Sequence, residues 1–231
     1  MSSTRRTGLL VSVCLACACR PQEPDPPTSA PHVEDPQLHS RMQQHFSDAA
    51  AVKDAVIDGD LGSIHARAQQ VVELEEPQLY AMAWRPHVVR LVEAADSVRE
   101  APDVPAAAVR TAQLAASCGR CHLAVQATPQ LPEAPAPSGG IMAHHHWAAA
   151  RMWEGIVAPS DAAWHEGTAA FVRAPGCGVD PDDELSDYLQ VLCEQLHGLA
   201  SRAAAAEDLD DRAIVYGDFL TTCAACHHAG P

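Results

Sequence analysis

The 231-residue sequence has few aromatic residues and a single lysine. Aromatic residues make up only 4% of the chain, and alanine is abundant. This composition favours helices, because alanine has the highest helix propensity and strands are usually rich in β-branched and aromatic residues. Alanine also buries little area, so a small bundle built from it has a thin core unless a large apolar group fills it. We therefore expect an all-α fold that can enclose such a group.

The scarcity of lysine also bears on possible partners. Lys53 is the only lysine, and the formal net charge is −15. Nucleic-acid binding depends on neutralising phosphates with Lys and Arg, so the sequence argues against nucleic acid as a partner. An acidic surface keeps a protein soluble, and it is also compatible with docking a basic redox partner protein. The sequence does not indicate an oligomeric state.

The first 19 residues have the pattern of an export signal. A charged start at Arg5 and Arg6 precedes an apolar run over residues 8–18, which is too short to span a bilayer as a stable helix. Cys17 and Cys19 follow small residues in a segment that resembles the lipobox of bacterial lipoproteins. We expect a lipoprotein of the bacterial periplasm, held to the membrane only by its lipid anchor, with a plain cleaved signal as the alternative. Residues 20–37, rich in proline and polar residues, are expected to form a disordered linker.

The rest of the chain contains an internal repeat. Methionine, histidine and apolar positions recur 100 residues apart, and near the end of each copy the spacing becomes 105. Each copy closes on the same five-residue pattern, Cys118-Gly-Arg-Cys121-His122 and Cys223-Ala-Ala-Cys226-His227. The matched positions at spacing 100 include Met42 and Met142, His45 and His145, and His65 and His165.

Each repeat is predicted to form four helices. In the first repeat these cover residues 38–57, 61–75 and 86–99, and a fourth starts near Pro105 and carries the motif at its far end. In the second repeat, a helix follows residues 138–140, Ser160 caps the next, and residues 180–183 signal the start of the third. We expect two tandem four-helix bundles, residues 38–125 and 140–231, joined by a proline-rich linker over residues 126–139.

The Cys-x-x-Cys-His motif is typical of covalent haem attachment. Two thiols three residues apart can each add to a haem vinyl group, and the adjacent histidine can then reach the iron as an axial ligand. The alternatives are a zinc site that joins both cysteine pairs and a dithiol redox pair. Structural zinc sites usually have closer pairs, and a dithiol leaves the histidine after both motifs unexplained. We therefore predict two covalently bound haem c groups, attached at Cys118, Cys121, Cys223 and Cys226, with His122 and His227 as iron ligands.

A four-helix bundle with its haem motif near the end of the last helix resembles cytochrome c prime and its low-spin relatives. Arg41-Met42, an apolar stripe and Gly59-Asp60 are similar to the opening of that family's first helix. The resemblance implies a first-helix residue over the other face of the iron, either methionine or a bulky apolar group. That position maps to Met42 and Met142.

This sequence departs from the family pattern in having His45 and His145 one helical turn later on the same face. Either member of each pair is a candidate distal ligand, and the two methionines are alternatively core side chains. His65 and His165 are expected to contact the first turn or a haem propionate. Cys177 and Cys193 fit a disulfide in an oxidising compartment, with a free buried pair as the alternative.

The predicted function is electron transfer by an exported di-haem c-type cytochrome, and not an enzymatic reaction. The alternative is a haem protein with five-coordinate iron that binds or senses a gas such as NO or CO. Reduction of peroxide or of a nitrogen oxide is disfavoured, because no separate acid–base constellation accompanies the motifs.

Overall fold

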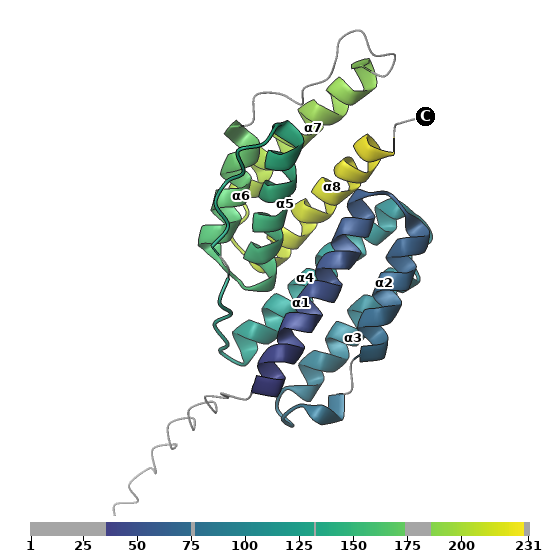
Figure 1. The fold of residues 1–231 in the computed structure, drawn as a ribbon, viewed down its shortest axis with the longest axis vertical. Coiled ribbons are helices and arrows are strands. Elements are labelled where there is room, and N and C mark those ends of the chain that lie inside the picture. Colours follow the sequence, from purple (N-terminus) through teal and green to yellow (C-terminus); the bar gives the residue numbers. More distant parts are fainter. Residues whose placement is uncertain (1–35, 75–76, 132, 174–185, 229–231) are drawn as a thin grey trace, which may run out of the picture. The chain divides into compact units, whose positions relative to one another are not determined.

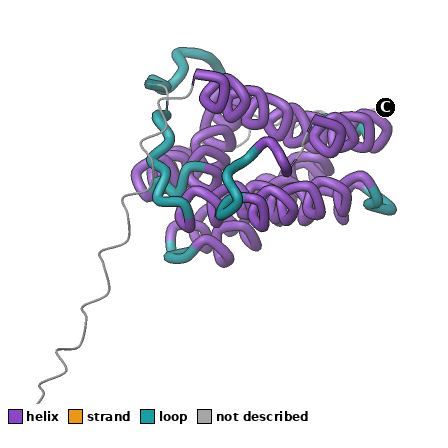
Figure 2. Tube along the Cα trace, turned by 90° about the horizontal axis from the view of Figure 1, so that it is seen from below, coloured by secondary structure: helices purple, strands orange, loops and turns teal. Residues whose placement is uncertain are grey.

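The computed structural model describes residues 36–74, 77–131, 133–173 and 186–228. These residues form eight α-helices and one short 3-10 helix, and no strand occurs among them (Figure 2). The prediction of an all-α fold is therefore confirmed. No helix in these ranges has an apolar stretch long enough to cross a lipid bilayer.

The helices of the first repeat begin and end within two residues of the predicted positions. Gly59 follows the first helix with a φ of 73°, a conformation that glycine adopts without strain. Asp103 caps the last helix, because its side chain accepts a 2.8 Å hydrogen bond from the Ala106 backbone N–H. The four helices are α1 (Pro36–Ile57), α2 (Leu61–Leu74), α3 (Arg85–Arg99) and α4 (Val104–Ala124), and the 3-10 helix Pro77–Leu79 precedes α3.

The second repeat has the same succession of helices. Ser160 caps its second helix as predicted, accepting a 3.2 Å hydrogen bond from the Ala163 N–H, and Asp208 caps its last helix. The predicted start signal at residues 180–183 lies outside the described residues. Residues 126–131 and 133–139 form no helix, and the Ala134 carbonyl accepts a hydrogen bond from the Trp147 indole. The four helices are α5 (Ile141–Val157), α6 (Asp161–Arg173), α7 (Ser186–Ala204) and α8 (Leu209–His227).

The described residues of the two repeats share one hydrophobic core within a single compact unit. Helices α4 and α8 pack directly against each other at its centre (Figure 1). Their close approach depends on small residues, because a Cβ at Gly217 would lie only 3.1 Å from the Cα of Val109. The last helix of each repeat is therefore covered by the last helix of the other.

Candidate functional site

Both Cys-x-x-Cys-His motifs occupy the last turns of their helices. Cys118 and Cys121 lie near the end of α4, and Cys223 and Cys226 lie near the end of α8. None of the four cysteines forms a disulfide, and all four are half-buried. The two histidines differ, because His122 is half-buried and His227 is exposed.

The two motifs lie at opposite ends of the α4–α8 pair, because these helices run antiparallel. Arg120, inside the first motif, forms an ion pair with Asp210 at the start of α8, and Val109, near the start of α4, lies beside Gly217. Extending this antiparallel alignment along both helices places the end of α8 beside the start of α4 (Figure 1). The two motifs are thus separated by most of the length of α4. From the first motif to the start of this helix the distance is about 24 Å, at 1.5 Å per residue.

This separation removes the zinc interpretation of the four cysteines. A zinc ion needs its thiolates about 2.3 Å from the metal, so the two cysteine pairs cannot share one ion. The dithiol interpretation is disfavoured by position and by charge. Redox-active thiols have a lowered pKa, often because they lie at helix N-termini, whereas these pairs lie at the negative, C-terminal ends of two helices. Burial raises the pKa of the Cys121 and Cys226 thiols and raises the pKa of Cys223 to about 12, and it outweighs the opposite effects of Arg90 on Cys121 and of Lys53 on Cys223.

Each motif is covered by the first helix of the other repeat. The end of α5 lies against the end of α4, where His122 Nδ1 is 2.7 Å from the Val157 carbonyl oxygen. The end of α1 lies against the end of α8, where a Cβ at Gly59 would be 3.4 Å from His228 Cβ. Gly119 permits the first of these contacts, because a Cβ there would overlap the carbonyl oxygen of Ile156. Both repeats therefore contribute to the surroundings of each motif.

The hydrogen bond of His122 determines which of its ring nitrogens can bind a metal. A carbonyl oxygen only accepts, so Nδ1 must carry the proton and donate it to Val157. Nε2 then presents its lone pair, which is the arrangement that orients a metal-bound histidine and fixes its tautomer. Burial lowers the pKa of His122, which keeps the ring neutral as metal binding requires.

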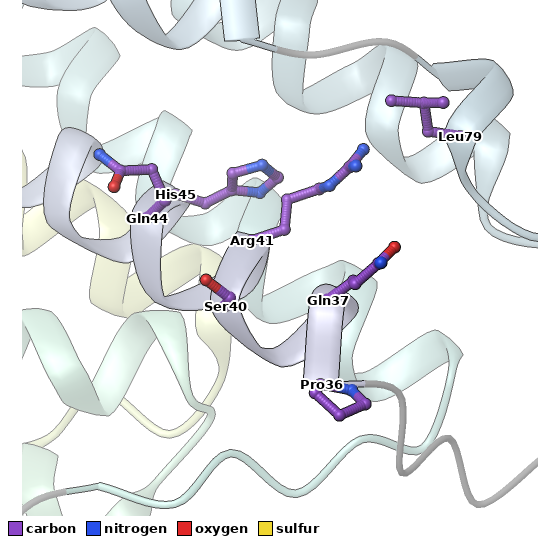
Figure 3. Close-up of a pocket in the computed structure, with 7 residues that line it drawn as sticks. All are labelled: Pro36, Gln37, Ser40, Arg41, Gln44, His45 and Leu79. Atoms are coloured by element: carbon purple, nitrogen blue, oxygen red, sulfur yellow. The ribbon is translucent and has the colours of Figure 1, made fainter.

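The candidate distal ligands of the first repeat lie beside an open cavity at the start of α1. Met42 and His45 are both half-buried, and His45 Nε2 lies 3.2 Å from the Tyr80 hydroxyl. The cavity has a volume of about 650 Å³, within the usual range for cofactor pockets of about 300–1,000 Å³. Figure 3 shows Arg41 and His45 extending from α1 into the space that Leu79 borders.

The candidate distal ligands of the second repeat are in different surroundings. Met142 is 49% exposed, so it is not part of the core. His145 packs against the ring of Phe171, with the ring centroids 5.2 Å apart, and its Nε2 is buried without a hydrogen-bond partner. Burial lowers the pKa of His145, and the nearby His197 lowers it further. A buried ring nitrogen without a hydrogen-bond partner is unusual, and a metal bound to its lone pair would satisfy it. This observation favours His145 over Met142 as the candidate ligand.

The other predicted site residues are two histidines and the remaining cysteines. His65 Nε2 lies 2.9 Å from the Ala101 carbonyl oxygen, just before the start of α4, whereas the first motif lies near the end of that helix. His165 is exposed. Cys193 is disulfide-bonded, and its partner is outside the described residues. The predicted partner and the two predicted lipidation sites also lie outside them: Cys177, Cys17 and Cys19.

Sequence reasoning missed several polar residues outside the motifs that the fold buries at least in part. His197 on α7 is a half-buried histidine near His145, and its Nε2 is buried without a hydrogen-bond partner. Lys53 on α1 is 4% exposed and lies 2.8 Å from Asp54. Glu154 on α5 is buried beside Arg151, and burial raises the pKa of its carboxyl. The position of Lys53 within the apolar segment 52–57 could have indicated a buried charge. The proximity of His197 to His145 could be seen only in the three-dimensional structure.

The residues of the motifs fit a haem better than a metal ion held by the protein alone. No three His, Cys, Asp or Glu side chains are grouped to hold an ion in the ranges 36–74, 77–131, 133–173 and 186–228. A haem iron needs only one or two axial ligands from the protein. The neutral, oriented His122 and the unpartnered Nε2 of His145 are donors of that kind.

Comparison of the chain with protein-family models, with curated proteins and with solved structures gives no match.

Proposed function

We propose that this protein is an exported di-haem c-type cytochrome that acts in electron transfer. The observation that carries the proposal is His122, which follows Cys118 and Cys121 and donates through Nδ1 to the Val157 carbonyl, so that Nε2 is directed to a ligand. In this proposal each repeat is a four-helix bundle with one haem attached to its last helix. The resemblance to cytochrome c prime and its low-spin relatives supports the same assignment.

The chain's own residues have separate roles in this function. The thiols of Cys118 and Cys121, and of Cys223 and Cys226, form the thioether links, while His122 and His227 supply the axial nitrogens. Bound haem supplies a one-electron iron couple. The residues around it exclude water and set the potential through ligand identity and burial.

The second axial positions are assigned from the first helix of each repeat. His145 is proposed over Met142, because its Nε2 is buried without a partner and Met142 is 49% exposed. In the first repeat both Met42 and His45 remain candidates, since both are half-buried. Arg41, in the cavity beside them, is a cation suited to a haem propionate.

The test is the absorption spectrum of the mature protein, purified from a host with the haem c attachment machinery. Oxidised and dithionite-reduced spectra are recorded with and without carbon monoxide. Sharp reduced α and β bands that carbon monoxide leaves unchanged are expected for two six-coordinate irons. Broad bands that shift with the gas would replace electron transfer with gas binding, and the absence of a Soret band would overturn the haem assignment.

A pair of matched variants counts the attachment sites. Cys118→Ser with Cys121→Ser, and Cys223→Ser with Cys226→Ser, should each leave one haem per chain by pyridine haemochrome absorbance and intact mass. Cys193, outside both motifs, provides the control, because Cys193→Ser should retain two haems. Retention of two haems in either motif variant would contradict the assignment.

A further inference from the structure

Tyr80 lies at the end of the first repeat that carries the first motif, and it contacts His45 there. The Arg85 guanidinium, at the start of α3, donates a 3.1 Å hydrogen bond to the Tyr80 carbonyl oxygen. Arg90, farther along α3, is so close to Cys121 that its charge opposes the effect of burial on the pKa of that thiol. The start of α3 is therefore near the end of α4, and the 3.2 Å contact between the Tyr80 hydroxyl and His45 Nε2 adds the start of α1.

The hydroxyl of Tyr80 is held in front of His45. Tyr80 is 5% exposed, and the Arg41 guanidinium lies 5.4 Å from the centre of its ring. Whichever group donates, the hydrogen bond with Tyr80 occupies His45 Nε2. If His45 turned this nitrogen to an iron, the buried hydroxyl would lose that hydrogen bond. The loss opposes such binding by about tenfold to a hundredfold.

The three histidines near the motifs therefore differ in the nitrogen that they offer to a metal. In His122 the hydrogen bond uses Nδ1 and leaves Nε2. In His45 it uses Nε2 and leaves Nδ1, which is next to Cβ and hence close to the helix backbone, where a flat haem has less room to approach. His145 is like His122 in this respect, because its Nε2 has no hydrogen-bond partner.

The ring beside His145 carries no hydroxyl. His145 packs against Phe171, with the ring centroids 5.2 Å apart, and Phe171 packs against Phe219 at 4.9 Å. Phe219 is one helical turn before Cys223, so this cluster lies next to the second motif. A phenylalanine ring cannot occupy the histidine nitrogen as the Tyr80 hydroxyl does.

The two methionines are placed in the opposite sense. Met42 is half-buried on α1, one helical turn before His45, whereas Met142 is 49% exposed. A thioether is only a weak hydrogen-bond acceptor, so Met42 gives up little when it binds iron. The methionine is thus the better placed ligand in the first repeat, and the histidine in the second.

We propose that Tyr80 withholds His45 from the iron of the first repeat, so that Met42 ligates that haem while His145 ligates the other. This inference rests on the proposed haem attachment. The haem on α4 then has one histidine and one methionine ligand, and the haem on α8 has two histidine ligands. Tyr80 is a positioning residue, since it acts through His45.

The first test is near-infrared magnetic circular dichroism of the oxidised full-length holoprotein, which separates methionine-ligated from bis-histidine ferric haem. The unaltered protein should show both signatures in equal amounts. Met42→Leu should remove the methionine signature, and Met142→Leu, the counterpart substitution, should leave both signatures unchanged. Two identical signatures in the unaltered protein would overturn the inference.

The second test removes the hydroxyl alone. Tyr80→Phe keeps the ring and releases His45, so it should shift the ratio of methionine to histidine ligation at the first haem by about tenfold or more. Tyr188→Phe is the matched control, since that side chain is 47% exposed on α7, and it should change nothing. Adding His45→Leu to Tyr80→Phe should restore the methionine signature. An unchanged spectrum in Tyr80→Phe would show that the hydroxyl does not select the ligand.

Haem content, measured by pyridine haemochrome absorbance, separates failure of this inference from failure of the proposed function. Two haems per chain with the same pair of ligands would overturn the inference and leave the proposed function intact. The absence of haem would overturn both.

Discussion

The two Cys-x-x-Cys-His motifs share a pattern and differ in their surroundings. The first contains Gly119, which lets α5 approach until His122 reaches the Val157 carbonyl. The second has Ala224 at the equivalent position, and its His227 is exposed. A single methyl group in the motif therefore accompanies a change from an anchored, half-buried histidine to an exposed one. The five-residue pattern is the same in both repeats, and the residues packed on it determine how far each histidine is exposed.

The two repeats also contribute different side chains to the shared core. The five largest fully buried side chains all belong to the second repeat: Trp153, Trp164, Tyr216, Phe171 and Phe219. The buried residues of the first repeat are mostly alanine and valine. Aromatic side chains bury about 150–250 Å² each, so the second repeat has more stabilisation of its own. The first repeat depends more on its contacts with the second.

Cutting the chain between the two repeats should have the largest effect on stability, and it tests whether the first repeat depends on the second. A fragment of residues 36–125 lacks α8 and α5, which cover α4 and the first motif. It should lose cooperative thermal unfolding, measured by circular dichroism at 222 nm. Mixing it with a fragment of residues 140–231 should restore the transition, because the shared core does not need the linker. A cooperative transition in the first fragment alone would show that the repeats are independent.

Gly119→Ala should have the next largest effect, because its Cβ would overlap the Ile156 carbonyl. Overpacking of this kind destabilises by about 1–3 kcal/mol, measured as the free energy of unfolding in urea. Gly198→Ala is the control, since a Cβ there meets nothing within 4 Å, and it should stabilise α7 by about 0.5–1 kcal/mol. Equal effects of the two substitutions would mean that α4 and α5 are not closely packed.

Tyr216 and Thr111 occupy equivalent positions, 105 residues apart, on α8 and α4. Tyr216 donates a 2.9 Å hydrogen bond to the Ala149 carbonyl, whereas the Thr111 hydroxyl is buried without a partner. Tyr216→Phe should therefore destabilise by about 1 kcal/mol, and Thr111→Val should leave the free energy of unfolding unchanged or raise it. Chemical denaturation of both variants checks this, and a stability loss in Thr111→Val would indicate that its hydroxyl has a partner.

The smallest expected effect concerns Asp161 and Arg212, a pair whose counterparts in the first repeat are Leu61 and Ala107. The hydrogen bond and charge of Arg212 lower the pKa of the Asp161 carboxyl from 3.8. Because the unfolded chain binds the proton more readily, the stabilisation is complete above about pH 4 and is lost as the pH falls through the folded pKa. Asp161→Asn should flatten this small acid-side slope in thermal unfolding. Leu61→Asn, the counterpart substitution, should leave the slope unchanged.

The sequence was sufficient to predict the helices, because their signals are local. The caps, the glycine after α1 and the proline in the first turn of α3 all act within a few residues, and the helices of the first repeat begin and end within two residues of their predicted positions. The repeat spacing of 100 also predicts which methionines and histidines are equivalent in the two repeats, such as His45 and His145.

The partners of those helices could not be predicted in the same way. An apolar stripe shows which face of a helix is buried, but not which helix covers it. The contact of His122 with Val157 joins residues 35 positions apart across the linker, and that of Gly59 with His228 joins the end of the first helix of one repeat to the end of the last helix of the other. No local pattern encodes such contacts, so the surroundings of both motifs required the three-dimensional fold.

The packing of each repeat's first helix against the other repeat's motif has an implication for the origin of such a chain. When one surface of each unit contacts the equivalent surface of the other reciprocally, the interface has two-fold symmetry. A protein with one such repeat would need a second copy to complete its motif, and every substitution would then appear at both sites. Joining the copies in one chain breaks that constraint. It lets a lysine at position 53 and a tryptophan at position 153 coexist, which an identical pair of subunits cannot do.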